Sequence, residues 1–379
     1  MKDLPLWRSP RAGVLGAVLM ALPMAVLSAS PLAGGYLAAA VLFIWPAAVC
    51  VAGLVSGGLS LLLGAGAALL AMGRTFGQNG LLLATVYLIP ILAVFVYVIL
   101  RRVPFRRGCF FLIGAHVIAL AAVYWLLQEM AGGDLYTRAG ELAVEGLQAW
   151  PLGDTLLYNF YEMGLLELPA KLAEGALVAV PGGYTLSDAA RQDLLLSAKA
   201  LVTSLLASMV PGVIARQSIL GGVGCLLLPL RLGFVAQERR EFPGSTPPAE
   251  TPAQGEEKEK AFVHFPDLGM PPFRTWHLPR GMGWQAGLAL VGGYFLQVSE
   301  TPAVAVAGAI LYAAAGAVWA IQGAALINYT QHLRGTRRFW RILIPLLLLS
   351  TSLLLIVGVF DQITNARGLR KPPEPKEES

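Results

Sequence analysis

The sequence predicts an all-α integral membrane protein, a polytopic helical bundle of about eight or nine transmembrane helices. Of its 379 residues, 56% are hydrophobic and 13% are charged, and the mean hydropathy is +0.64. Soluble domains carry roughly 25% charged residues. Several apolar runs approach or exceed the ~20 residues that a helix needs to cross the hydrocarbon core. None alternates with period two, so these runs favour helices over barrel strands.

Nine apolar stretches are the expected spans if each crosses the membrane once. They cover residues 12–28, 36–55, 58–72, 80–100, 108–130, 194–219 with an extension to 232, 282–298, 302–328 and 339–360. The first begins like a signal peptide, but the first apolar segment of a multispanning protein usually remains as a span. The third is short and rich in glycine, so it is expected to cross, or to be broken or re-entrant.

The basic residues predict a cytoplasmic N-terminus in a bacterial inner membrane. Arginine and lysine concentrate before the first, fifth and ninth stretches and after the sixth, and basic loops stay in the cytoplasm. The loop 131–193 has nine acidic and three basic residues, as expected outside. Nine spans place the basic tail around Arg370 outside and eight place it inside, so the span number and the side of the C-terminus stay open.

Composition divides the chain into successive parts. These are a six-span front part at 1–236 with the external loop 131–193, a disordered cytoplasmic linker at 237–264, an interfacial collar at 265–281, a three-span back part at 282–361 and a polar tail at 362–379. The linker is rich in Pro, Glu and Lys and cannot bury a core. Within the external loop, apolar residues over 157–168 have helical spacing, typical of a helix at the membrane surface or of a lid on the bundle.

The collar has the sequence FPDLGMPPFRTWHLPR. Tryptophan favours the headgroup layer, and Pro279 suits the start of the following helix. Phe273 and Trp276 are therefore expected to anchor the collar in lipid, or to form a clasp for a partner protein.

Three segments of the second half resemble the YybS-like family of uncharacterised bacterial inner-membrane proteins. They are PPFRTWHLP, IQGAALINYTQHLRGTRRFWR and VGVFDQITNARGLRK. The family pattern falls on the collar residues Phe273, Trp276, Leu278 and Pro279, on Gln322 and Gly323, and on Gly358, Phe360 and Asp361. The front half is similar to the substrate-binding S components of energy-coupling-factor transporters and to the rod-shape protein MreD. This resemblance implies a membrane protein but no established activity.

No catalytic or metal-binding pattern is present, so we expect neither an enzyme nor a cofactor. The four histidines are dispersed, and no HExxH, GxSxG or P-loop sequence occurs. His116 lies in an apolar stretch, where a hydrogen-bonded packing role is favoured over a ligand role. The cysteines, Cys50, Cys109 and Cys225, lack CxxC spacing and are expected to be small buried hydrophobes.

Polar residues at membrane depth are the candidate ligand-binding residues, because burying them in lipid is costly unless they face a cavity or a partner. They are Arg216, Gln217, Gln322 and Asn328. Arg216 lies instead near headgroups if the long sixth stretch bends at Pro211. Gln322 and Asn328 face different sides of a helix, and helix–helix hydrogen bonds explain them equally well.

Two function hypotheses follow. The first is a small-solute-binding membrane component, powered by a separate ATPase module through a transmembrane coupling protein. The S-component resemblance implies that Ala17 and Ala21, spaced four apart, form the helix-docking face toward that protein. Chance and packing within the chain explain the spacing as well. The second is a non-enzymatic scaffold of an envelope-assembly complex, in which the linker and collar recruit partners. Neither hypothesis involves nucleic acid.

Overall fold

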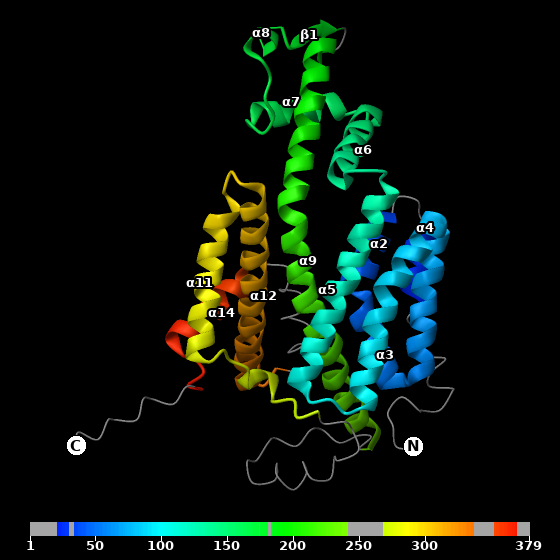
Figure 1. The fold of residues 1–379 in the computed structure, drawn as a ribbon, viewed down its shortest axis with the longest axis vertical. Helices are drawn as coiled ribbons and strands as arrows, with labels where there is room; N and C mark the ends of the chain where they lie inside the picture. Colours follow the sequence, from blue (N-terminus) through cyan, green and yellow to red (C-terminus); the bar gives the residue numbers. More distant parts are fainter. Residues whose placement is uncertain are drawn as a thin grey trace, which may run out of the picture. The chain divides into compact units, whose positions relative to one another are not determined.

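The computed structural model describes residues 21–29, 34–173, 175–180, 183–241, 268–336 and 352–369. It divides into two compact units, which are described separately. Unit 1 comprises 1–123, 214–292 and 311–379, and unit 2 comprises 124–213 and 293–310. The predicted all-α membrane class is confirmed, since nearly all described elements are helices and several are long and apolar (Figure 1).

Unit 1 holds most of the apolar helices. Its elements are α2 (Gly34–Phe43), α3 (Trp45–Ser56), α4 (Gly58–Leu100), most of α5 (Phe105–Met130), the second half of α9 (Asp188–Glu241), the short 3-10 turn η3 (Phe273–Thr275), most of α11 (Arg280–Gln297), α12 (Pro302–Leu333) beyond residue 310, and α14 (Leu353–Thr364). Residues 21–29 are also helical.

The helices α2 and α3 form one bent pair with an angle of 55° between them. Pro46 lies in the first turn of α3. Proline lacks the N–H that would bond the carbonyl four residues earlier, and its ring clashes with that carbonyl. The expected second span therefore has a break next to Leu42 and Phe43.

The element α4 contains two of the expected spans. Gly77 adopts φ 65° and ψ −152°, which is not helical. A Cβ built on Gly80 lies 2.4 Å from the carbonyl oxygen of Met72, eight residues earlier, so the chain folds back at Gly77. The expected third and fourth spans are thus joined by a tight glycine turn.

The expected number of nine spans is not established. Among the described residues, four helices are long and apolar enough to cross a membrane, or five if the α2–α3 pair counts as one span. One of these four, α4, is divided by the turn at Gly77 and contains two of the expected spans. The first and ninth expected spans fall largely on 12–20 and 339–351, outside the described residues, as do residues 242–264 of the expected linker and 370–379 of the tail.

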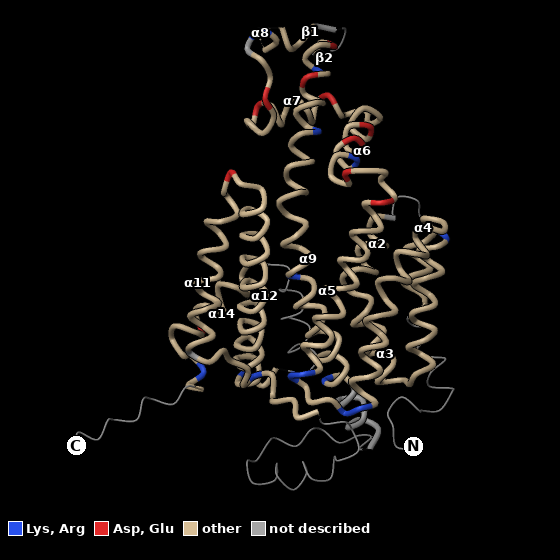
Figure 2. The backbone as a smooth tube through the Cα atoms, viewed as in Figure 1, with Lys and Arg blue, Asp and Glu red and all other residues tan. Residues whose placement is uncertain are grey.

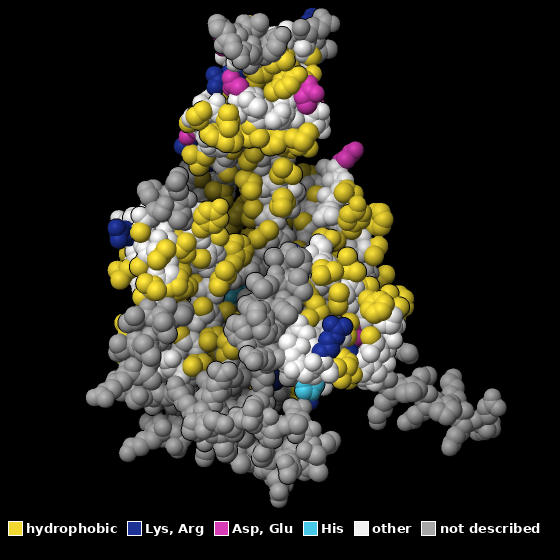
Figure 3. Space-filling view, turned by 180° about the vertical axis from the view of Figure 1, so that it is seen from behind, with side chains coloured by type: hydrophobic (Ala, Val, Ile, Leu, Met, Phe, Trp, Pro, Cys, Tyr) yellow, Lys and Arg dark blue, Asp and Glu magenta, His cyan; other side chains and the backbone are white. Residues whose placement is uncertain are grey.

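Hydrophobic side chains dominate the described surface seen in Figure 3, as expected for helices that face lipid. On α11, for example, Trp284 is 76% exposed and Leu288 is 70% exposed. The arginines of unit 1 gather mainly near the collar, where α4 ends and α5 begins (Figure 2).

Unit 2 contains the expected external loop. Its elements are α6 (Leu135–Ala149), α7 (Gly153–Glu162), α8 (Ala170–Ala173), the antiparallel hairpin of β1 (Leu177–Val180) and β2 (Gly183–Leu186), and the first half of α9. Leu157 of α7 is buried with Leu186 and Leu194 in a small core. The amphipathic segment thus forms a helix that packs on β2 and α9, and it ends at Glu162.

Candidate functional site

The first polar cluster of unit 1 lies at the break between α2 and α3. Because Pro46 provides no N–H, the carbonyl of Leu42 accepts from side chains of two other helices. The Tyr87 hydroxyl donates to Leu42 O at 2.5 Å. The Gln217 amide donates to Leu42 O at 3.3 Å and to Phe43 O at 3.1 Å. Side chains from α4 and α9 therefore meet at the end of α2.

The depth of Gln217 follows from helix geometry. Arg231, on the same helix, donates to the carbonyl of Pro271 in the collar at 3.2 Å. Fifteen residues separate Arg216 from Arg231, so Arg216 lies about 22 Å along α9 from the collar. This separation is most of the thickness of a hydrocarbon core, which is about 30 Å.

Next to the break, a histidine and two cysteines form a buried group. Cys225 Sγ lies 3.9 Å from His116 Nε2, and the Cys50 and Cys225 thiols interact with each other. All three side chains are 0% exposed. A Cβ on Gly221 lies 2.8 Å from the His116 ring, so only glycine at this position lets α5 bring the ring so close to α9.

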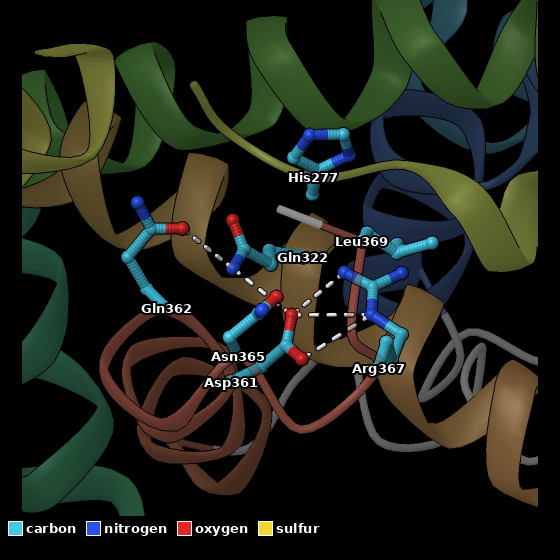
Figure 4. Close-up of a pocket in the computed structure, with 7 residues that line it drawn as sticks. All are labelled: His277, Gln322, Asp361, Gln362, Asn365, Arg367 and Leu369. Atoms are coloured by element: carbon cyan, nitrogen blue, oxygen red, sulfur yellow. Dashed lines mark hydrogen bonds and ion pairs between the residues drawn. The ribbon is translucent and has the colours of Figure 1, made fainter. Parts of the chain in front are cut away.

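The second polar cluster joins the collar to α12 and α14 (Figure 4). Arg367 and Asp361 form an ion pair at 2.7 Å with both side chains almost fully buried. The Gln322 amide donates to Asp361 at 3.1 Å and to the side-chain oxygen of Gln362 at 3.0 Å. The oxygen of the same Gln322 amide accepts from the backbone N–H of Leu278 in the collar at 3.1 Å.

Figure 4 shows these side chains around a small hollow that His277, Asn365 and Leu369 also line. Arg367 adds a second tie to the collar by donating to the Arg274 carbonyl at 2.7 Å. Donors and acceptors satisfy one another in this cluster, which we call the collar lock. It therefore resembles a structural contact more than a ligand site.

The collar also contacts the front part of the chain. The N–H of Phe105, at the start of α5, donates to Leu268 O at 2.7 Å. The rings of Phe105 and Trp276 lie 5.2 Å apart, and those of Trp276 and Phe273 lie 5.0 Å apart. Phe273 packs against the cluster of Ala320, Ala324 and Leu354. Phe273 and Trp276 thus clasp the front part to the back part within one chain.

The structure separates the residues singled out in the sequence. Gln217 joins the break, Gln322 joins the collar lock, and Arg216 and Asn328 are half-buried on α9 and α12. Pro279 is exposed just before α11. Ala21 is half-buried and helical, while Ala17 lies outside the described residues.

Sequence reasoning did not identify Tyr87, Asp361 or Arg367 as members of a site, nor the pairing of Cys50 with Cys225. Proline spacing is the signal for Tyr87, because Pro46 frees a carbonyl that must find a donor. No group of three or more His, Cys, Asp or Glu side chains in the described part of the chain is arranged to hold a metal ion.

The family model described as "Predicted membrane protein (DUF2232)" matches residues 263–362. The matched part includes the collar, α11, α12 and most of α14, with Gln322 and Asp361 of the collar lock. No curated protein and no solved structure matches the chain. Together with the apolar helices, the match supports a multi-pass membrane protein of an uncharacterised kind.

Proposed function

We propose that this chain is a small-solute-binding membrane component of a transport system, similar in role to an S component, with its solute at the α2–α3 break. The observation that carries the proposal is the Leu42 carbonyl, freed by Pro46 and held by Tyr87 and Gln217. Broken transmembrane helices with polar partners at membrane depth form the binding sites of many transporters.

The chemistry of the break favours a small polar solute. The carbonyls that end α2 carry partial negative charge and the start of α3 carries partial positive charge. Tyr87 and Gln217 are neutral donors that a solute can displace or bridge. Arg216, the neighbour of Gln217 on α9, favours a solute that also has an acidic or strongly accepting group.

The proposed transport system also needs an energy source and a membrane location. Because the sequence has no nucleotide-binding motif, energy comes from a separate ATPase module through a coupling protein. The chain binds its solute without changing it chemically, in a bacterial inner membrane with the N-terminus in the cytoplasm. The alternative, an envelope-assembly scaffold, is less favoured because Phe273 and Trp276 are engaged within the chain.

The test is affinity purification of the full chain in mild detergent, with mass spectrometry of copurified proteins and small molecules. Vitamin-like compounds and their precursors are then screened for thermal stabilisation. A solute at 100 times its Kd stabilises the protein by about 2.7 kcal/mol, which raises Tm by several degrees. Gln217→Ala removes one hydrogen-bonding group and should weaken binding about tenfold.

Ser208→Ala is the matched control on the same helix, because the exposed Ser208 hydroxyl donates to the Leu205 carbonyl within its own turn. It should leave the affinity unchanged. The proposal is rejected if no small molecule copurifies and no compound raises Tm. Recovery of envelope-assembly proteins in place of an ATPase module favours the scaffold.

A further inference from the structure

The group of His116, Cys50 and Cys225 has a geometry that simple packing does not require. Cys50 on α3 and Cys225 on α9 come from separate helices of unit 1, yet their thiols interact. His116 on α5 approaches Cys225 through the gap left by Gly221. Three helices therefore converge on one dithiol.

The two cysteines are 175 residues apart in the sequence. The two cysteines lie on different helices, α3 and α9, and meet only because those helices pack together in unit 1. Both are free thiols.

The hydrogen bonds of His116 define which ring nitrogen is the base. Nδ1 lies 2.9 Å from the carbonyl oxygen of Leu112. A carbonyl only accepts, so Nδ1 carries the proton, and the neutral ring has its lone pair on Nε2. Nε2 is the atom that faces Cys225 Sγ. The histidine is therefore oriented to accept the proton of the Cys225 thiol.

We propose that Cys50 and Cys225 are a reversible dithiol–disulfide pair, oxidised by an uncharged two-electron oxidant that dissolves in the bilayer, with His116 as the base. His116 Nε2 takes the Cys225 proton, and the thiolate sulfur attacks the oxidant to form an adduct. The Cys50 sulfur then attacks the Cys225 sulfur, which forms the S–S bond and breaks the bond to the oxidant. Two electrons and two protons leave with the oxidant, as a hydroquinone from a quinone or as two waters from hydrogen peroxide.

The burial of both thiols determines which oxidants can reach them. Both thiols are 0% exposed among apolar helices, so a charged oxidant has no favourable route to them. Buried cysteines are ordinarily inert because nothing removes their proton. His116 supplies that base here, whereas Cys109, which is also buried, has no histidine among its described contacts and is a control within the chain.

The test counts free thiols in the full chain in native membranes. A short-chain benzoquinone, hydrogen peroxide or the charged oxidant tetrathionate is added, and acid quenching, denaturation and labelling with a maleimide polymer follow. The reduced wild type should label three times, and the protein oxidised by either uncharged compound should label once, at Cys109. Cys50→Ala and Cys225→Ala should each label twice before and after oxidation. Peptide mass spectrometry identifies the linked residues.

His116→Gln tests the base. Its oxidation rate should fall at least tenfold at neutral pH and recover as the pH is raised, because hydroxide then removes the proton. Gly114→Ala is the matched control on α5, since a Cβ there meets nothing within 4 Å. The proposal is overturned if three thiols remain after both uncharged oxidants, if Cys109 is in the bond, if tetrathionate reacts as fast, or if His116→Gln reacts like the wild type.

Discussion

The Asp361 carboxylate shows how a single buried charge is held in this protein. It accepts from Nε of Arg367 at 3.2 Å, from a terminal nitrogen of Arg367 at 2.7 Å and from Gln322 at 3.1 Å. A buried ion pair of this kind adds little net stability, because removing both charges from water is costly. Its value lies in geometry, since the pair aligns α14 with the collar.

Asp361→Asn should destabilise the protein by about 3–5 kcal/mol, because Arg367 remains buried without its counter-charge. Thermal unfolding in detergent measures the change. The double variant Asp361→Asn with Arg367→Met should recover part of the loss. Glu145→Gln is the control, as this exposed carboxylate pairs loosely with Arg138 at 3.6 Å. A loss below about 1 kcal/mol for Asp361→Asn would contradict the role given to the pair.

At the scale of the element, α12 and α14 cross through two glycines. A Cβ on Gly323 lies 2.0 Å from the carbonyl oxygen of Leu354, and a Cβ on Gly358 lies 2.0 Å from that of Trp319. Both distances are too short for any side chain. Small residues let two helix backbones approach closely, as is common in membranes.

Gly323→Ala should push α12 away from α14 and lower stability by about 1–3 kcal/mol, the usual range for overpacking. Gly292→Ala on α11 is the matched control, because a Cβ there meets nothing within 4 Å. The control should be neutral or stabilising by up to about 1 kcal/mol, since alanine favours helix. Equal Tm changes for the two variants would argue against close packing at the crossing.

The first turn of α6 should respond to acid. Asp134 caps this helix, and hydrogen bonds from Thr137 and Tyr136 lower the pKa of its carboxyl. Arg138 and Lys199 lower the pKa of Glu141. Because the folded pKa values are depressed, the contribution is complete above the ordinary values near 4 and is lost as the pH falls through the folded values.

We therefore expect the amide protection of α6, corrected for intrinsic exchange, to fall when the pH is lowered from 5 to 3. Asp134→Asn should lose part of this pH dependence, because its side chain still caps the helix but no longer titrates there. Hydrogen exchange with mass spectrometry measures both. Unchanged protection of α6 over this range would be inconsistent with the cap and ion pairs.

At the scale of the whole molecule, the distribution of charge predicts orientation. Arginines of unit 1 lie mainly near the collar (Figure 2). In a variant without the native cysteines, Gln148→Cys in α6 should react with an impermeant maleimide on intact cells. Pro272→Cys in the collar should react only after permeabilisation, because basic segments stay cytoplasmic. Both positions are exposed. If Pro272→Cys reacts on intact cells and Gln148→Cys reacts only after permeabilisation, the predicted orientation is wrong.

The sequence predicted the all-α membrane class, which the structure confirms. Apolar length and low charge predicted the helices. The glycine-rich third stretch was expected to cross, or to be broken or re-entrant; residues 58–72 form continuous helix in α4, and the chain turns after them, at Gly77. The sequence singled out Gln217 and Gln322 as polar residues in apolar stretches; in the structure each bonds groups on other elements, and a ligand role for them stays a prediction. Their partners could not be predicted, because Tyr87 and Asp361 are distant in sequence. A single sequence does not show which distant residues contact each other.

The sequence by itself determined that this is a helical membrane protein with a collar, since hydropathy and proline placement act locally. Only the tertiary structure decided that Phe273 and Trp276 pack within the chain, and that Pro46 frees a carbonyl for Tyr87 and Gln217. The physical reason is that hydropathy is a property of each segment, whereas hydrogen-bond partners at membrane depth depend on which helices pack side by side.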